Sequence, residues 1–302
     1  MIKINKCFYL GKIPTNLLTK SKNKANYLKA KLIKETLSTN FKYYCSLCLI
    51  IRDENEYLIE WLSWHINQGV EHFYIYDHGS KYPVKNFLFD NYPEYLDKIT
   101  IIDWSNKHKD AQVNAYNDCL NKTKYISRWL GFIDTDEQIN VKNKSLLDFL
   151  KDYEDYAGVY STWVTYGANK QIKQTNELLR KRFTEIKHIN NLDKIGKSIV
   201  QPLYMKEMII HNGCAEDGFI LVDEHKNKID NYALINENST KDFIYVDHYY
   251  TKSYEEWIKK IKRGSGHAKF ARRYDEFFKI NPNMEFCREN LNIIQEYENF
   301  EK

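Results

Sequence analysis

The sequence predicts an α/β protein with a mixed, mostly parallel sheet flanked by helices and followed by a helical C-terminal tail. Apolar segments of strand length alternate with helical segments between residues 43 and 133. This alternation is typical of βαβ units with right-handed crossovers. The apolar run 129–133 then meets three carboxylates, Asp134, Asp136 and Glu137. A buried strand of a parallel sheet has this form, because its charged residues begin where the sheet ends.

The other elements follow from the same periodicities. Leu58, Trp61, Leu62 and His65 recur at helical spacing before Gly69, which predicts a helix over 56–68. We expect strands at 44–51, 72–76, 99–104, 129–133, 158–165, 198–205, 219–222 and 243–246, and further helices at 25–37, at 111–120 and from 253 onward. The predicted divisions are a basic N-terminal segment with a helix (1–42), the sheet domain (43–250) and a basic helical tail (251–302).

Composition excludes several classes of protein. The 302 residues are 43% hydrophobic and 15% aromatic, which is ample for one large core. The net charge is +4 and basic residues are interspersed with acidic ones, so we expect no nucleic-acid partner. Cys45 and Cys48 lie in an apolar strand, which favours packing over a metal or redox pair. The segment Met1 to Leu10 lacks the apolar core of a signal peptide and no stretch reaches the length of a membrane span, so we expect a cytoplasmic location.

The carboxylates at 134 and 136 predict a metal site. In extended chain Asp134 and Asp136 share a face, and two adjacent carboxylates repel each other unless a cation lies between them. Carboxylate oxygens completed by nucleotide phosphates suit Mn²⁺ or Mg²⁺. The alternative is an ordinary surface turn after a strand, where Asp is common.

Two more strand ends carry polar loops, Arg52-Asp53-Glu54 and Asp77-His78-Gly79-Ser80. The carboxyl ends of parallel strands share one edge of the sheet, so these loops and the carboxylates are expected around one crevice.

This layout resembles the GT-A (Rossmann-like) nucleotide-sugar glycosyltransferases, in particular glycosyltransferase family 92 and bacterial relatives of the family-2-like group. The resemblance spans most of residues 45–265 and is carried by the following blocks in order: Arg52-Asp53-Glu54-x-x-Tyr57-Leu58-x-Glu60-Trp61-Leu62-x-x-His65, Gly69-Val70-x-His72-Phe73-Tyr74-x-Tyr76-Asp77-x-x-Ser80, Gln112, Trp129-x-Gly-Phe-Ile-Asp134-x-Asp136-Glu137, Lys197-Ser198-Ile199-Val200 and His248-Tyr249-x-x-Lys252-Ser253. It implies metal-dependent transfer of a sugar, most often galactose from UDP-galactose, with inversion at the anomeric carbon. Residues 167–197 have no clear match, which leaves the acceptor open.

The chemistry of this reaction assigns roles to the blocks. Asp134 would touch the ribose or a divalent ion, and Asp136 the ion, which would stabilise the leaving diphosphate. His248 would be the third ligand, with an ordinary strand-end histidine as its alternative, and Lys252 would reach the diphosphate. Asp53 and Asp77 would face the nucleobase and ribose, although loop capping is the alternative for each. The remaining donor-site predictions come from the matched blocks: Arg52, Glu54, Ser80, Gln112 and Lys197.

Inversion also requires a base that takes a proton from the acceptor hydroxyl. Glu216 and Asp217, in the run from His211 to Gly218, are the candidates, and Glu137 is the next choice. A hairpin turn is the alternative for the first pair, because Asp-Gly favours turns. Trp163 and Tyr166 would stack on the acceptor sugar, with core packing as the alternative for Trp163. We include His211 with the substrate-binding residues.

The basic tail, Lys262-Arg263-Gly-Ser-Gly-His267-Ala-Lys269-x-x-Arg272-Arg273, would suit contact with anionic lipid at the inner face of a membrane, where a lipid-linked glycan acceptor lies. A solvated helix face is its alternative. The predicted setting is synthesis of a surface polysaccharide or lipooligosaccharide. Alternative functions are a sugar-phosphate nucleotidylyltransferase, a catalytically silent glycan-binding protein on the same fold and a metal-dependent hydrolase. The first would need a basic Gly-rich loop after the first strand, where the chain has the acidic 52–55 segment.

Overall fold

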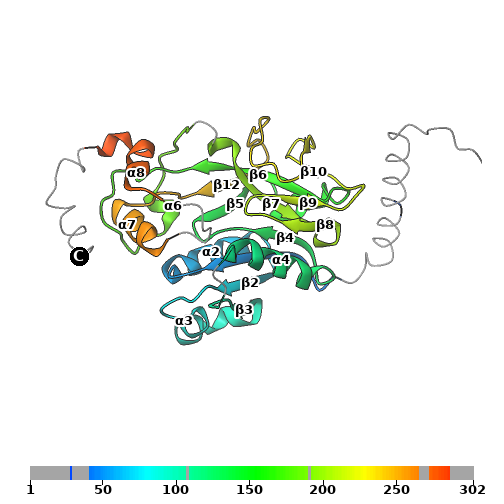
Figure 1. The fold of residues 1–302 in the computed structure, drawn as a ribbon, viewed down its shortest axis with the longest axis horizontal. Coiled ribbons are helices and arrows are strands. Elements are labelled where there is room, and N and C mark those ends of the chain that lie inside the picture. The colour runs from blue at the N-terminus through cyan, green and yellow to red at the C-terminus, as the bar shows by residue number, and fades with distance from the viewer. Residues whose placement is uncertain (1–27, 29–40, 107–108, 190–191, 265–271, 286–302) are drawn as a thin grey trace, which may run out of the picture.

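The computed structural model describes residues 28, 41–106, 109–189, 192–264 and 272–285. They form a large mixed sheet with helices on both faces and a separate two-stranded ribbon (Figure 1). The strands are β1 (Tyr43–Ile51), β2 (His72–Asp77), β3 (Ile99–Asp103), β4 (Ser127–Phe132), β5 (Glu137–Val141), β6 (Gly158–Thr165), β7 (Gly196–Val200), β8 (Met205–Met208), β9 (Gly213–Ala215), β10 (Leu221–Val222), β11 (Lys228–Ile229) and β12 (Ile244–His248). The α-helices are α2 (Asn55–Asn67), α3 (Val84–Asn91), α4 (Ala111–Thr123), α5 (Leu146–Lys151), α6 (Leu179–Arg182), α7 (Tyr254–Arg263) and α8 (Tyr274–Ile280).

The main sheet has the order β11-β10-β6-β7-β4-β1-β2-β3, and β12 pairs with both β6 and β5 beside it. Strands β3, β2, β1 and β4 are parallel to their neighbours, as expected for βαβ units. Strand β7 is antiparallel to β4 on one side and to β6 on the other. The sequence prediction of a mixed, mostly parallel α/β sheet flanked by helices is therefore confirmed. The helix predicted at 25–37 lies, apart from Leu28, outside the described residues.

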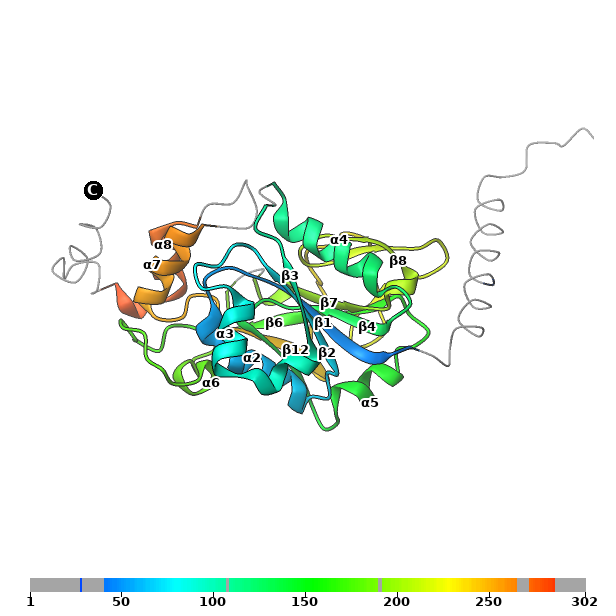
Figure 2. The same cartoon turned by 90° about the horizontal axis from the view of Figure 1, so that it is seen from below.

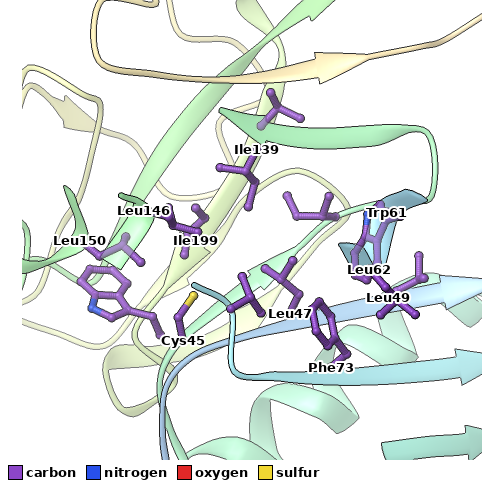
Figure 3. Close-up of a cluster of buried hydrophobic side chains, with 14 of the residues drawn as sticks. Cys45, Leu47, Leu49, Trp61, Leu62, Phe73, Ile139, Leu146, Leu150 and Ile199 are labelled. Atoms are coloured by element: carbon purple, nitrogen blue, oxygen red, sulfur yellow. The ribbon is translucent and has the colours of Figure 1, made fainter. Parts of the chain in front are cut away.

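The core lies on both faces of this sheet. Along β1, Leu47 and Leu49 point to one face and pack with Trp61 of α2, whereas Cys48 points to the other and packs with Tyr116 of α4. This is the period of two that a strand imposes on its side chains. Figure 2 shows α4 on one side of the sheet and α2, α3 and α5 on the other. Figure 3 shows the cluster on the α2 side.

Two segments differ from their prediction. After β4 the chain turns at Asp134 and continues as β5, a strand that begins at the third carboxylate, Glu137, and pairs antiparallel with β12. The single strand expected at 198–205 is two strands, β7 and β8. A short turn at Pro202 separates them, because proline lacks the N–H that a continuous ladder needs.

Helix α7, in the predicted tail, packs against the sheet domain. It begins with a capping box in which the Ser253 side chain accepts the backbone N–H of Glu256. The Glu256 carboxylate then forms a buried ion pair with Arg182 of α6. The next residue of α7, Trp257, is fully buried beside Phe277 of α8. Among the residues with described positions, no helix combines the length and the apolar character that crossing a bilayer requires.

Candidate active site

A cleft of about 550 Å³ opens where the strands predicted to carry polar loops end. Ile51 at the end of β1, His78 after β2 and Asp134 after β4 line one part of it. Trp163 of β6 and His248 of β12 line another part. The structure thus brings the ends of these strands together at one crevice, as the rule for open α/β sheets expects.

Asp134 is fixed by three side chains. Its Oδ1 accepts hydrogen bonds from Gln112 Nε2 at 3.0 Å and from the Tyr116 hydroxyl at 3.1 Å. Its Oδ2 accepts from Lys197 Nζ at 2.8 Å. Burial lowers the pKa of Lys197, but the carboxylates of Asp134 and Glu137 outweigh it and hold that pKa well above its usual value. Gln112 and Asp134 line the cleft, while Lys197 lies behind Asp134 as its buried counter-ion.

Asp136 has cations of its own. Its Oδ2 lies 2.6 Å from Lys260 Nζ and 3.6 Å from Lys252 Nζ. Burial raises the pKa of Asp136, yet the two lysines, Lys260 first, hold it well below its usual range. Asp136 is therefore ionised in a buried site, which is tolerable because a charge-assisted bond compensates its desolvation.

Glu54 connects the first strand-end loop to helix α7. Its Oε2 accepts from Thr135 Oγ1 at 2.7 Å, and its Oε1 lies 2.8 Å from Arg263 Nη1 and 3.4 Å from Lys252 Nζ. The Arg263 and Lys252 cations lower the pKa of Glu54 against the effect of burial. Glu54 and Arg263 line the cleft, and Arg52 lies at its edge.

Lys260 and Arg263 are site residues that the sequence analysis did not assign. In the sequence analysis, Arg263 belongs to the basic tail and Lys260 has no role. The signal for them is spacing within α7, because Glu256, Lys260 and Arg263 are four and three residues apart. That spacing places side chains on one face of a helix.

Two neutral histidines lie at the Trp163 side of the cleft. Burial lowers the pKa of His248 well below its usual value, and its ring is 4.1 Å from that of Trp163. The His211 ring meets Trp163 edge-on at 5.2 Å, and burial lowers its pKa to about 4. His211 Nδ1 hydrogen-bonds to the carbonyl oxygen of Gly196 at 3.0 Å. The other ring nitrogen of His211 therefore remains for a ligand in the cleft.

Asp53, Asp77 and Ser80 accept backbone N–H groups, Asp77 within its own loop and the other two between the loops after β1 and β2. Asp77 accepts the N–H groups of Ser80 and Val84, each at 2.9 Å. Ser80 Oγ accepts the N–H of Asp53 at 3.2 Å, and Asp53 Oδ1 accepts that of Lys81 at 2.7 Å. Buried Asp77 caps its own loop, which is the alternative given for it, and neither Asp77 nor Ser80 is in the wall of the cleft. Asp53 lines a second pocket beside it.

The three predicted bases are not brought to the cleft wall. Glu216 and Asp217 follow β9, where their side chains are 41% and 60% exposed and lie 3.9 Å from Lys124 and 2.6 Å from Lys206. The short β8–β9 ribbon ends before them and directs them to solvent. Glu137 is fully buried, and its Oε2 accepts the N–H of Asp134 at 2.8 Å.

Glu137 lies in the interior, and partly buried Tyr166 packs on another aromatic ring. Burial raises the pKa of Glu137 to about 8 despite the nearby Lys197. Tyr166 stacks on Tyr249 with ring centroids 5.1 Å apart and does not line the cleft. Trp163 does line it, with 7% of its surface exposed, so it is the aromatic residue of the predicted pair that a sugar would meet.

The predicted metal ligands fit a divalent ion in part. Within the described ranges, no three His, Cys, Asp or Glu side chains are arranged around one point as a metal cage. However, Asp136 and His248 lie at adjacent strand ends, because the N–H of Tyr249 donates to the Asp136 carbonyl oxygen at 2.9 Å. In the same part of the chain, buried His248 Nδ1 has no hydrogen-bond partner. Mg²⁺-type sites commonly use one or two carboxylates and take their other ligands from substrate phosphates and water, so this pair suits such an ion.

Comparison with known proteins agrees with the geometry. The family model "Glycosyltransferase family 92" matches residues 43–277. A glycosyltransferase family 92 protein of Ricinus communis is 27% identical over 34% of this chain and 17% of its own length. The Caenorhabditis elegans beta-1,4-galactosyltransferase galt-1 is 22% identical over 68% of this chain and 50% of its own length. The Arabidopsis thaliana galactan beta-1,4-galactosyltransferase GALS2 is 24% identical over 47% of this chain and 28% of its own length. The chain thus aligns with half or less of these relatives. Because the family model covers most of the chain, this protein belongs to glycosyltransferase family 92.

Proposed function

We propose that this protein transfers a sugar, galactose in the first instance, from a UDP-sugar to a hydroxyl group of a glycan or lipid-linked glycan. The observation that carries the proposal is the strand-end cleft in which Asp134 and Asp136 lie together, each with a lysine on its carboxylate. The names of the galactosyltransferase relatives support galactose as the sugar. In this proposal the nucleotide occupies the side of the cleft formed by β1, β2 and Gln112.

The donor half of the reaction needs positive charge where the diphosphate leaves. Lys260 and Arg263 line the cleft, and Lys252 lies in the adjoining second pocket, 3.6 Å from Asp136. These cations would form charge-assisted bonds to phosphate oxygens. A Mn²⁺ or Mg²⁺ ion held by Asp136 and His248, with Asp134 beside them, would supply further electrostatic stabilisation of the departing nucleotide. Both effects act in a partly buried site, where charge is poorly screened by water.

The acceptor half needs an apolar surface and a hydrogen-bond acceptor for the attacking hydroxyl. Trp163, Ile195 and Leu234 provide apolar surface in the cleft, and sugars stack well on such faces. His211 is neutral and presents one nitrogen there, so we assign it the hydrogen bond from the acceptor hydroxyl. Inversion of the anomeric carbon would require this hydroxyl to attack the face of the sugar opposite the leaving diphosphate.

A donor screen tests the proposal. The purified protein is incubated with single nucleotide sugars, Mn²⁺ and oligosaccharide acceptors, and the glycosylated product is measured by mass spectrometry. We expect turnover of one UDP-sugar, and loss of about a hundredfold or more in Asp136→Asn. The matched control is Asp152→Asn, since Asp152 is an exposed residue that pairs with Lys144 at the surface. Full activity of Asp136→Asn, or product with no nucleotide sugar, would refute the proposal.

We also propose that the protein works at a membrane surface. A lipid-linked acceptor at the cytoplasmic face of a membrane, in surface polysaccharide or lipooligosaccharide synthesis, would present phosphate close to exposed Lys259 and Lys262 of α7. Sedimentation of the protein with vesicles of anionic lipid, compared with neutral vesicles, tests this contact. Equal sedimentation with both would exclude it.

A further inference from the structure

The ammonium group of Lys260 binds the carboxylate of Asp136, to which the proposed function assigns a metal ion. Its Nζ lies 2.6 Å from Asp136 Oδ2 and 2.8 Å from the carbonyl oxygen of Tyr250. Lys260 is 5% exposed and Asp136 is 6% exposed, so this pair is shielded from water. A lysine at the surface would exchange its partner freely, whereas a buried one is held by the bonds it makes.

Lys252 and Lys260 both lie near the same oxygen of Asp136, Oδ2. Lys252 Nζ lies 3.6 Å from it, and that ammonium also sits over the ring of Tyr57 at 4.2 Å from the centroid. Lys252 therefore has a second favourable surrounding in the aromatic face. Lys260 also lies over a ring, 4.7 Å from the centroid of Tyr250, but its shortest contact is the bond to the Asp136 carboxylate.

We propose that Lys260 and a divalent cation are alternative partners of Asp136. In the metal-free protein the ammonium of Lys260 compensates the buried carboxylate, and binding of the ion requires Lys260 to leave Asp136. The proposal rests on the assignment of Asp136 to the cation site. It extends the proposed function, because it makes Lys260 a residue that sets when the ion binds.

Repulsion between positive charges predicts that Lys260 weakens the binding of a divalent cation. An ammonium already bonded to Oδ2 would stand within a few ångströms of an ion bound to the same carboxylate, and like charges at that distance repel strongly in a buried site. A diphosphate brings negative charge into the cleft and would balance both cations. Lys260 should therefore weaken the binding of Mn²⁺ alone and couple it to the binding of a nucleotide.

The test is a titration of Mn²⁺ followed by electron paramagnetic resonance of the free ion, without sugar donor or acceptor. Wild type is compared with Lys260→Met and Lys260→Gln, both of which remove the charge. The glutamine variant keeps a donor for the Tyr250 carbonyl, so it serves if the methionine variant does not fold. The matched control is Lys259→Met, because Lys259 is on the same helix but contacts Gln174 and Glu255.

We expect both neutral Lys260 variants to bind Mn²⁺ at least about tenfold more tightly than wild type, with Lys259→Met unchanged. Addition of UDP should tighten Mn²⁺ binding more in wild type than in the Lys260 variants. Equal affinity in wild type and the Lys260 variants would overturn the proposal, as would undiminished binding by Asp136→Asn or no Mn²⁺ binding by any of these proteins. Because no sugar is present, a protein that fails to transfer galactose can still pass or fail this test.

Discussion

His65 Nε2 accepts a hydrogen bond from the backbone N–H of Ile139 at 3.1 Å, while His65 Nδ1 donates to the Trp61 carbonyl oxygen at 2.8 Å. The imidazole is fully buried, and burial lowers its pKa to about 3. These bonds require the neutral form with its proton on Nδ1, because a protonated Nε2 could not accept from Ile139. The ring thereby ties α2 to β5, the strand that follows the two aspartates.

This arrangement predicts a loss of stability in acid. The unfolded histidine titrates near 6.5 and the folded one near 3, so the unfolded state binds more protons in between. The contribution is complete above pH 6.5 and is lost progressively as the pH falls through this window. Between pH 7 and pH 5 we expect about 2 kcal/mol less stability from His65, measured by urea unfolding. His65→Gln should lack this portion of the pH dependence, and an identical pH profile in both proteins would contradict the assignment.

Asp77 is predicted to act on stability and not on the donor. Asp77→Ala leaves the backbone N–H groups of Ser80 and Val84 without their acceptor, since both bonds end on this carboxylate. We expect a loss of about 1–3 kcal/mol in the free energy of unfolding. The Michaelis constant for the nucleotide sugar should stay within about twofold of wild type at a temperature where the variant is folded, because only loop geometry changes. A large rise in that constant with unchanged stability would restore the ribose-binding prediction for Asp77.

Glu216→Gln and Asp217→Asn are expected to keep wild-type turnover. Both side chains are largely exposed and pair with surface lysines outside the cleft. In contrast, His211→Asn should lower turnover by about a hundredfold, the size typical for loss of a positioned proton acceptor. Product formation under saturating donor and acceptor measures all three. If Glu216→Gln fell by that factor and His211→Asn did not, the base would lie where the sequence first suggested.

The sequence predicts correctly those elements whose secondary structure follows from their own residues. The run before Asp134 is apolar and ends in charges, so its strand and its edge follow from local chemistry. Strand β5 was missed because Gln138 is buried through a bond to Glu60, a partner 78 residues away. Lys260 was missed for the same reason, since it lies 124 residues from Asp136. Such positions are set by how helices dock on the sheet, which periodicity does not encode.

The docking of α7 depends on the pair between Arg182 and Glu256, and this yields the last prediction. Arg182 Nη2 lies 2.5 Å from Glu256 Oε2 and Nη1 lies 3.0 Å from Oε1, with the side chains 1% and 2% exposed. Arg182→Met would leave a buried carboxylate without its cation, which costs about 3–5 kcal/mol. The double variant with Glu256→Gln should recover part of that loss. The exposed pair of Lys144 and Asp152 is the control, because Lys144→Met should cost less than about 1 kcal/mol.

Urea unfolding of the four proteins gives these differences directly. Since α7 carries Lys260, Arg182→Met should also loosen the contact with Asp136, and its Mn²⁺ affinity should shift toward that of the Lys260 variants. A cost for Arg182→Met no larger than that for Lys144→Met would mean that α7 is held by its apolar face, where Trp257 is fully buried, and not by this ion pair.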